Sequence, residues 1–451
     1  MKKIIITTVL SFSLLAPMLA QDKIWSLDDC MRYAVENSPK VKKQVYTHNT
    51  YKAERDRSIA AFFPTVSTSV GTQYSFGRSI DQATNTYIGN KTTFNNDYSL
   101  STEIPIFTGG QLINSWLQAK SNLNMGKNDI QKAKDDLALE IMSAFADVVY
   151  YKGTIKMASD KLEESNQTLY KVRRQEELGL KGKADIAQFE AQVAADDYAL
   201  THQQNLYNTA LLTLREKMNY PSDLELDVDT LLPDITPNPV VENVAEIFDY
   251  AQFNNPTALQ ADFQLESSKY DYRIYKGQLL PQIYFNAGLR TNYFKDLATK
   301  EDSSTREVAS FNSQMKNNLG EYLGFSVSFP LFSGLRKMTN VRRYRNNMRI
   351  AQETKTEVLR QLQSAIEQSV LDREGYTKEV IQMDRKVKSD DIAYRVTLRK
   401  YEEGLMSSLD VQTSANVLLT SKADLLQKKL MLMMKSKLVE YYKGNPLYSK
   451  E

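Results

Sequence analysis

The chain offers few side chains that could perform catalysis or bind a metal. It has 451 residues, with one cysteine and two histidines. A single thiol excludes a disulfide framework and a multi-thiolate metal site, and two histidines disfavour a histidine-rich metal centre or a Ser-His-Asp triad. Cys30, His48 and His202 have no partner motif, so packing or surface roles are expected for them. We therefore predict no catalytic residue, no metal site and no cofactor.

One glycine-lysine segment superficially resembles a phosphate-binding loop. In residues 179–183 (GLKGK) the glycines are too close together for that motif, and no strand is expected before them. The segment instead has a counterpart, because Gly179 is followed by Asp185 as Gly404 is followed by Asp410. A glycine is favoured at a helix end and an aspartate at a helix start, so both aspartates are expected to be N-caps.

These paired turns belong to a duplication that covers most of the chain. Four motifs recur in the same order, at an offset of 217 residues for the first two and 225 for the others. Chance would hardly give four ordered matches, so the sequence predicts two copies of one unit. The matched pairs are 37–39 with 254–256, 63–66 with 280–283, 105–109 with 330–334, and Gly179–Asp185 with Gly404–Asp410.

The duplication sets the predicted organisation. Residues 1–20 have the layout of a secretory signal peptide, with two lysines before a short apolar run, so the mature protein is expected to be exported. The first repeat is assigned to 21–220 and the second to 241–446. A proline-containing linker at 221–240 joins them, and 447–451 form a tail. Each repeat is predicted to contain a short helix, two strands and a long helical hairpin.

The strands are predicted from alternating polarity at about 64–76 and 94–106, and at about 281–294 and 319–331. A period of two puts the apolar and polar sets on opposite faces of a sheet. Strands of about ten residues with one face of each kind fit a membrane barrel with a wet interior, and a soluble sandwich is the alternative. The polar set includes Asp97, Glu103 and Arg290, which would line the lumen of such a barrel.

The long hairpins are predicted at 110–220 and 334–445, where no proline occurs. Apolar residues recur at heptad-like steps, as in Leu123, Ile130 and Leu137, which is typical of a coiled coil. As one continuous helix, the first arm of each hairpin would be roughly 100 Å long. No later segment supplies 18 consecutive apolar residues, so no helix is expected to span a membrane.

The number of strands implies an oligomer. Four strands cannot close a transmembrane barrel, and open sheet edges in lipid cost several kcal/mol for each unpaired group, so the edges must pair with other chains. The charge balance, 57 basic against 55 acidic residues, gives no reason to expect nucleic acid as a partner.

Several short motifs in this order carry a family resemblance. They are Trp25-Ser26-Leu27 opening a helix, Asn37-Ser38-Pro39, the Pro-x-Phe-x-Gly turns after the second strands, and the paired Gly-Leu-x4-Asp turns. Over essentially residues 25–446 the chain resembles the TolC family of outer-membrane efflux proteins. The resemblance implies a homotrimer whose twelve strands form one outer-membrane barrel, continued by a periplasmic α-helical tunnel. It also implies a periplasmic adaptor protein and an inner-membrane transporter as partners, and lipid around the barrel.

The resemblance also implies site residues at the periplasmic tip. Asp410 and its counterpart Asp185 would lie at the pore constriction. In a trimer, three Asp410 carboxylates would form a ring that favours cations and raises the pKa of each. The residues that match adaptor-contact positions at the tip are Leu178, Gly179, Leu180, Gly404 and Leu405.

Two positions depart from the family pattern at this tip. Met406 stands where the family has a basic residue, and Thr413 where it has a second acid. These departures argue against the charged links that hold the tip closed in relatives. Lys181 and Lys183 are candidates for part of that role, and Tyr401 matches a family aromatic near the links.

The function predicted from these features is a passive outer-membrane exit duct. The alternative is a structural coiled-coil protein that spans the periplasm without a pore, against which the alternating strands argue. A secreted enzyme of mixed fold is a third hypothesis, but the sequence contains no constellation of nucleophile, base and oxyanion donors.

Overall fold

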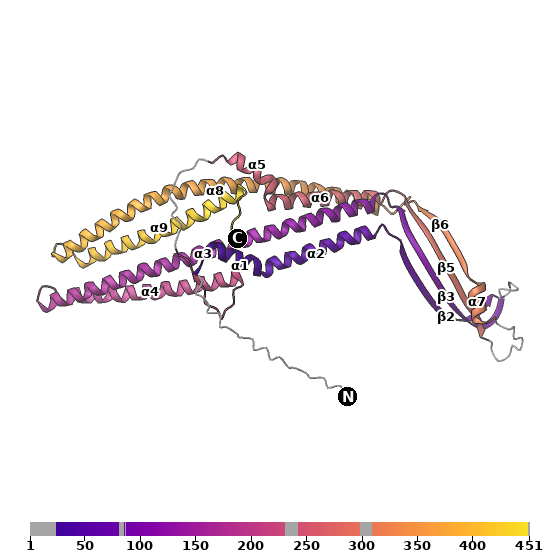
Figure 1. Ribbon diagram of the computed structural model, residues 1–451, viewed down its shortest axis with the longest axis horizontal. Helices are drawn as coiled ribbons and strands as arrows, with labels where there is room; N and C mark the ends of the chain where they lie inside the picture. The colour runs from indigo at the N-terminus through magenta and orange to yellow at the C-terminus, as the bar shows by residue number, and fades with distance from the viewer. Residues whose placement is uncertain (1–23, 81–84, 86, 231–241, 298–308, 450–451) are drawn as a thin grey trace, which may run out of the picture. The chain divides into compact units, whose positions relative to one another are not determined.

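A computed structural model describes residues 24–80, 85, 87–230, 242–297 and 309–449 (Figure 1). The predicted signal peptide at 1–20 lies outside the described residues, as do part of the predicted linker and the end of the predicted tail. The described chain forms two compact units. One, the helical unit, comprises residues up to 41, 134–247 and 366 onward, and the other, the sheet unit, comprises 42–133 and 248–365. Each unit therefore draws on both sequence repeats.

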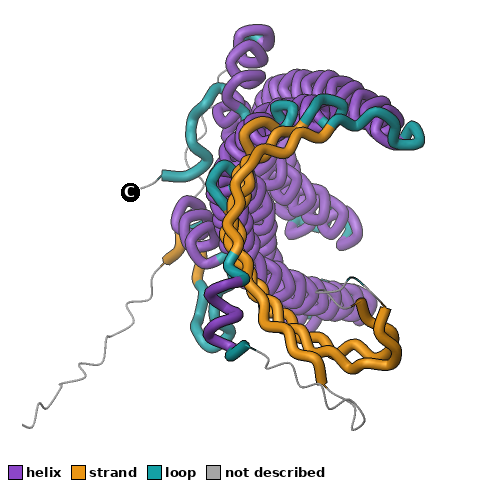
Figure 2. Tube along the Cα trace, turned by 90° about the vertical axis from the view of Figure 1, so that its right-hand side faces the viewer, coloured by secondary structure: helices purple, strands orange, loops and turns teal. Residues whose placement is uncertain are grey.

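The sheet unit contains four strands, β2 (Thr65–Ile80), β3 (Tyr87–Phe107), β5 (Gln282–Leu297) and β6 (Gly320–Ser328). They pair antiparallel in the order β2-β3-β5-β6, so each repeat contributes one half of the sheet (Figure 1). Viewed in Figure 2, the strands follow an arc rather than a flat plane.

The strand bounds differ from those expected from polarity alone. β3 begins at Tyr87, well before the predicted start at 94, because its first residues pair with the end of β2 without a clear apolar alternation. The last strand was predicted to reach 331 but ends at Ser328. Pro330 follows closely, and a proline has no N–H to donate to a strand ladder.

Two helices, rather than the single short helix that was expected, precede the strands of each repeat. These are α1 (Leu27–Asn37) with α2 (Pro39–Ala60), and α5 (Val244–Asn254) with α6 (Pro256–Gly277). In each pair, a single residue followed by a proline separates the two helices. The proline disfavours the helical conformation of the residue before it, and it is itself well suited to the first position of the next helix. Asn255 also caps α6, since its side chain accepts a hydrogen bond from the Thr257 N–H at 2.9 Å.

The long hairpins are formed by α3 (Gln111–Glu177) with α4 (Lys183–Met218), and by α8 (Arg336–Glu402) with α9 (Ser408–Tyr442). α3 and α8 each have 67 residues, which confirms the expected long continuous helices. Both begin in the sheet unit and end in the helical unit.

The core of the helical unit includes the first described residues and part of the predicted linker. β1 (Ile24–Trp25) pairs in parallel with β4 (Asp227–Val228). The Trp25 ring packs edge-on against Tyr33 and Tyr220, with centroids 5.3 and 5.4 Å apart. Cys30 is fully buried in the same core, as expected for a small apolar side chain.

A short helix, α7 (Phe311–Asn317), lies in the connection between β5 and β6. The second repeat is eight residues longer than the first in this span, because the offset between matched motifs changes from 217 before it to 225 after it. The Gln314 side chain accepts from the Phe294 N–H and donates to its C=O, both at 3.0 Å. It thereby satisfies main-chain groups of β5 beyond the point where β6 begins.

Candidate functional site: the hairpin turns and the polar sheet face

The two long hairpins turn through the same backbone geometry. Gly179 and Gly404 have φ of 72° and 78°, in the left-handed region where glycine is favoured. After each glycine, the next N–H bonds to a carbonyl five residues earlier, Leu180 to Gln175 at 2.9 Å and Leu405 to Lys400 at 2.8 Å. These are Schellman endings, which satisfy the last carbonyls of α3 and α8.

The aspartates after these turns are not N-caps, contrary to the expectation from the sequence. The N-caps are Gly182 and Ser407, and the aspartates are the third residues of α4 and α9. From that position each carboxylate reaches back to the main-chain N–H of the cap residue, Asp185 to Gly182 at 3.1 Å and Asp410 to Ser407 at 2.9 Å. This is the carboxylate half of a capping box, which satisfies an otherwise unpaired N–H.

Asp410 has an additional partner that Asp185 lacks. The Ser407 hydroxyl donates to the Asp410 carboxylate at 2.7 Å, whereas Gly182 has no side chain to do so. The two hydrogen bonds from Ser407 favour the ionised form and lower the pKa of Asp410 below its usual value. The side chain is exposed, so the charge is available to solvent and ions at the turn.

Behind the turns, the two hairpins share an apolar cluster. Phe189 of α4 and Tyr401 of α8 meet with ring centroids 5.6 Å apart. Met406, partly buried, packs against this cluster. The buried members are Leu169, Val172, Phe189, Tyr394, Tyr401, Val411 and Leu418.

Tyr401 occupies an unusual position in this cluster. Its side chain is only 3% exposed, and its hydroxyl has no hydrogen-bond partner among the described residues. Burial, with a smaller contribution from the nearby Asp185 carboxylate, raises the pKa of Tyr401 to about 12. The Lys181 ammonium lies 4.1 Å from the ring centroid, a cation–π contact that joins the first turn to α8.

Polar contacts also join the hairpins close to the turns. Lys171 of α3 pairs with Glu402 of α8 at 2.9 Å. Ser408 of α9 hydrogen-bonds the side chain of Gln188 on α4, and Gln412 donates to the Gln188 carbonyl at 3.5 Å. These contacts link the first repeat to the second, which the sequence could not indicate.

The leucines of both turns point into solvent. Leu178, Leu180 and Leu405 are 64%, 70% and 71% exposed. Exposed apolar side chains clustered at a turn are typical of contact surfaces, because their burial by a partner is favourable.

In the sheet unit, the register places Asp97, Glu103 and Arg290 on one face. Asp97 lies opposite Gly71 and Asn292, and Arg290 lies opposite Ser99, two residues further along β3. Asn95 donates to the Asp97 carboxylate at 2.6 Å on this face. The three residues expected to line a lumen are thus brought to the same side of the sheet.

The opposite face carries the apolar set. Phe285 and Phe325 pack edge-on across β5 and β6 with centroids 5.2 Å apart. Most of the apolar side chains of this face on the two edge strands lie open, including Val66, Val70, Tyr74, Phe76, Leu323, Phe325 and Val327.

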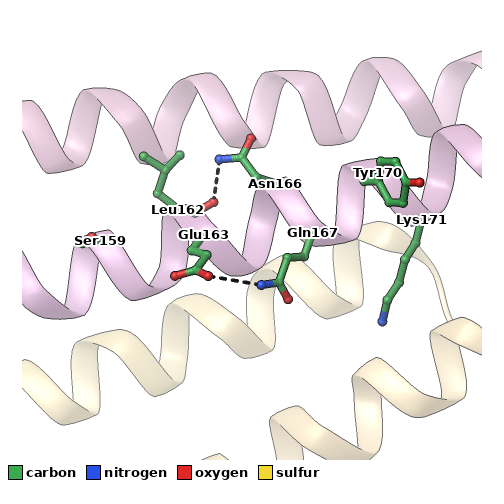
Figure 3. A pocket seen from close by; sticks show the side chains of 7 residues that line it. All are labelled: Ser159, Leu162, Glu163, Asn166, Gln167, Tyr170 and Lys171. Atoms are coloured by element: carbon green, nitrogen blue, oxygen red, sulfur yellow. Dashed lines mark hydrogen bonds between the residues drawn. The ribbon is translucent and has the colours of Figure 1, made fainter.

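One surface that the sequence did not single out lies along α3. An open groove of about 720 Å³ is lined by one stripe of the helix, with side chains at three- and four-residue steps (Figure 3). Asn166 donates to the Leu162 carbonyl and Gln167 to the Glu163 carboxylate, so these side chains lie along the helix (Figure 3). Tyr170 at one end is 74% exposed. In the sequence, the signal that could have indicated this groove is the heptad-like spacing of the residues that line it.

His48 lies at a helix contact and His202 lies on the surface, in line with the packing or surface roles expected for them. His48 contacts Gly126 of α3, and His202 stacks on Tyr198 with centroids 6.1 Å apart. Among the described residues, no three histidine, cysteine or acidic side chains are grouped so that they could hold a metal ion. Within the same part of the chain, no helix is both long and apolar enough to cross a membrane.

The fold is similar to solved outer-membrane channels at low sequence identity. The Campylobacter jejuni CmeC outer membrane channel is 13% identical with a TM-score of 0.80, over 94% of this chain and 87% of that one. The Neisseria gonorrhoeae MtrE outer membrane channel is 14% identical with a TM-score of 0.73, over 94% and 89%. The Vibrio cholerae outer membrane protein VceC is 16% identical with a TM-score of 0.75, over 93% and 96%. A comparison with curated protein sequences gave no match.

A family profile agrees with the duplication and the fold. The profile of the family described as Outer membrane efflux protein matches residues 31–219 and 248–433, one segment in each repeat. Because these segments make up most of the sequence, the chain belongs to the outer membrane efflux protein family.

Proposed function

We propose that three copies of this chain form an outer-membrane channel that is the exit duct of a tripartite efflux or type I secretion system. The observation that carries the proposal is the four-stranded sheet, which has one polar face, one apolar face and two open edges and continues into helices of 67 residues. A sheet of this kind suits lipid on one side and water on the other.

The open edges support the trimer. β2 and β6 end the strand order, so each has one side without a strand partner among the described residues. In lipid, every unpaired main-chain group costs several kcal/mol, so the edges require strands from other chains. Three chains supply twelve strands, an even number within the range of outer-membrane barrels.

Conduction in this duct is passive. Direction and energy come from an inner-membrane transporter, which a periplasmic adaptor protein joins to the tip of the duct. The exposed leucines of the turns, Leu178, Leu180 and Leu405, supply the adaptor surface together with Gly179 and Gly404. Their exposure supports this role, since a tip without a partner gains nothing from open leucines.

Asp410 forms the pore constriction, with Asp185 near it in the first turn. Three Asp410 carboxylates around one axis repel each other, which raises the pKa of each, while the bonds from Ser407 act in the opposite direction. The ring concentrates cations at the inner end of the duct. On the barrel side, Asp97, Glu103 and Arg290 line the lumen.

The test is single-channel conductance of the purified protein in planar bilayers, with the mass of the same sample measured by light scattering. We expect a trimer with cation-selective conductance, and weaker selectivity and divalent block in Asp410→Ala. Asp384→Ala, which removes an acid paired with Lys388 on the distal part of α8, is the matched control and should leave both unchanged. A monomer, or an oligomer that does not conduct, would overturn the proposal in favour of a periplasmic coiled-coil protein without a pore. Unchanged selectivity in Asp410→Ala would remove Asp410 from the constriction.

A further inference from the structure

The junction between β6 and α8 carries a concentration of positive charge. From Arg336 to Arg349 the sequence has six basic residues and no acidic one. α3 and α8 begin at equivalent positions, Gln111 and Arg336, 225 residues apart. The same fourteen positions of the first repeat, 111–124, contain one lysine. The charge is therefore particular to the second repeat and is not needed to build this junction.

Three of these residues form a row on one face of α8. Arg342, Arg345 and Arg349 are spaced by three and four residues, so they project from the same side of the helix. All three are exposed, and no carboxylate among the described residues pairs with them. Like charges at this spacing repel each other, so the row destabilises an isolated helix. Binding of an external anion would relieve this repulsion.

The row does not lie on the side of α8 that contacts α6. On its other side α8 packs against α6, through the stacked rings of Tyr344 and Tyr275 at 3.7 Å and the Lys337 bond to the Gln278 carbonyl. In the first repeat, Lys120 and Asn124 match Arg345 and Arg349. Lys120 and Asn124 are exposed although α3 has α2 on one side and α6 on the other, whereas Leu117, which matches Arg342, is half-buried.

The segment just before the row is apolar and open. Leu331 and Phe332 are 93% and 82% exposed. Leu335 is exposed as well and has φ of 65°, a left-handed conformation that is costly for leucine. Its counterpart Gly110 adopts the same conformation with φ of 76°, at little cost. The second repeat therefore keeps a largely exposed leucine at a position where glycine suits the backbone.

Apolar side chains followed within about ten residues by unpaired arginines match the boundary between acyl chains and headgroups. We propose that Leu331, Phe332 and Leu335 enter the periplasmic leaflet of the outer membrane and that the arginine row (Arg342, Arg345, Arg349) binds the phosphates of anionic phospholipids. A guanidinium group can donate two parallel hydrogen bonds to the oxygens of one phosphate. With a rise of 1.5 Å per residue, the row lies about 9 to 20 Å from the first residue of α8 along the helix axis. The inference rests on the proposed insertion of the sheet in the outer membrane.

The experiment measures thermal unfolding of the detergent-purified full chain with increasing dioctanoyl phosphatidylglycerol or dioctanoyl phosphatidylcholine. We expect an apparent affinity for phosphatidylglycerol at least about ten-fold above that for phosphatidylcholine. The triple variant Arg342→Gln, Arg345→Gln, Arg349→Gln should lose most of this preference, and the triple lysine variant should retain it. The matched control is Lys378→Gln, Arg385→Gln, Arg399→Gln, which removes three exposed charges from the distal part of α8.

An undiminished preference in the triple glutamine variant, or an equal loss in the control, overturns the proposal. Inorganic phosphate that protects as well as phosphatidylglycerol also overturns it, because the row would then bind a free anion. Leu335→Gly provides a second test, of the apolar part of the proposed surface, that does not depend on charge. It relieves the left-handed leucine, so it should raise stability in detergent while lowering affinity for both lipids, and unchanged lipid affinity would contradict the apolar part of the surface.

Conductance of the same samples separates this inference from the proposed function. A conducting trimer without lipid preference overturns the lipid surface alone. A protein that does not conduct overturns the channel, whatever its lipid preference.

Discussion

Ser407 and Asp410 form reciprocal hydrogen bonds at the start of α9. The Ser407 N–H and hydroxyl both donate to one carboxylate oxygen of Asp410, at 2.9 and 2.7 Å, and the Asp410 N–H points back to the Ser407 oxygen at 3.3 Å. The first repeat has only one of these bonds, because Gly182 replaces the serine. The second turn therefore holds its aspartate in a fixed position and in its ionised form.

Ser407→Ala should raise the pKa of Asp410, because it removes the hydroxyl donor that favours the carboxylate. The ionised form selects cations, so selectivity is present at neutral pH and is lost as the pH falls through the Asp410 pKa. We expect that loss at a higher pH in the variant, measured as reversal potentials from about pH 7 to pH 3. Ser407→Thr keeps the hydroxyl and should titrate like the wild type. A midpoint that stays the same or falls in Ser407→Ala contradicts the assignment.

The same bonds predict how stability at this cap depends on pH. The folded-state pKa of Asp410 lies below the unfolded value, so the stabilisation is present above the unfolded value of 3.8 and is lost as the pH falls through the folded-state value. Hydrogen exchange of the first turn of α9 should therefore accelerate in acid more in the wild type than in Asp410→Asn. Equal acid sensitivity in the two proteins would argue against this cap.

Tyr401→Phe should leave the tip as stable as the wild type or stabilise it by about 1 kcal/mol, because it removes a buried hydroxyl without a partner and keeps the ring. Tyr401→Ala should destabilise it by about 3 kcal/mol, since it opens a cavity beside Phe189 and removes the surface under Lys181. Hydrogen exchange of α3 and α8 near the turns measures both. If Tyr401→Phe were as damaging as Tyr401→Ala, the hydroxyl must gain a partner in the assembled protein.

Gly404→Ala should destabilise the α8–α9 turn by about 1 kcal/mol, because φ of 78° is unfavourable for any residue with a Cβ atom. Nothing lies within 4 Å of that position, so the cost is conformational rather than steric. Gly375→Ala, inside α8, is the control. Gly375 has an ordinary helical backbone and open space around it, so alanine should stabilise α8 by about 1 kcal/mol. Shifts of the same sign in the two variants would contradict the backbone argument.

Adjacent positions on β3 test which face of the sheet meets water. In a Cys30→Ala background, Ser99→Cys lies on the face of Asp97 and Arg290 and should react with a charged thiol reagent in intact membranes. Leu100→Cys lies on the opposite face, where we expect lipid, and should not react. Cys30 is the one cysteine of the sequence, so its replacement leaves no competing thiol. Equal reactivity at both positions would indicate a sheet that has water on both sides.

Tyr170→Asp should weaken the oligomer if a neighbouring copy covers the groove along α3. Tyr170 is open to solvent in the single chain, so the substitution costs little folding stability, but a charge there would be buried in a helix–helix contact. Light scattering should then show dissociation at low protein concentration. Tyr198→Asp, at an equally exposed tyrosine on α4, is the control and should leave the trimer intact.

The local features of this protein were predictable because they depend on residues close together in the chain. The turns require only Gly179 and Gly404, whose left-handed backbone is cheap for glycine. The break between α1 and α2 is also local, because it follows from Pro39, but one short helix was predicted there and the break was missed. Alternating polarity was sufficient to place the strands, although not their ends, since pairing extends β3 into residues without an apolar pattern. Duplication was visible as repeated spacing.

The tertiary structure decided everything that depends on which segments meet. No local pattern pairs β3 with β5, yet that pairing brings Asp97 and Arg290 to one face. Lys181 and Tyr401 are 220 positions apart in the sequence (401 − 181 = 220). Their contact therefore exists only because the two hairpins pack together. The aspartates were predicted as N-caps because residue type alone does not distinguish a cap from the third residue of a capping box. That distinction depends on where the helix begins, which in α9 is set by the Ser407 backbone and its bonds to Asp410.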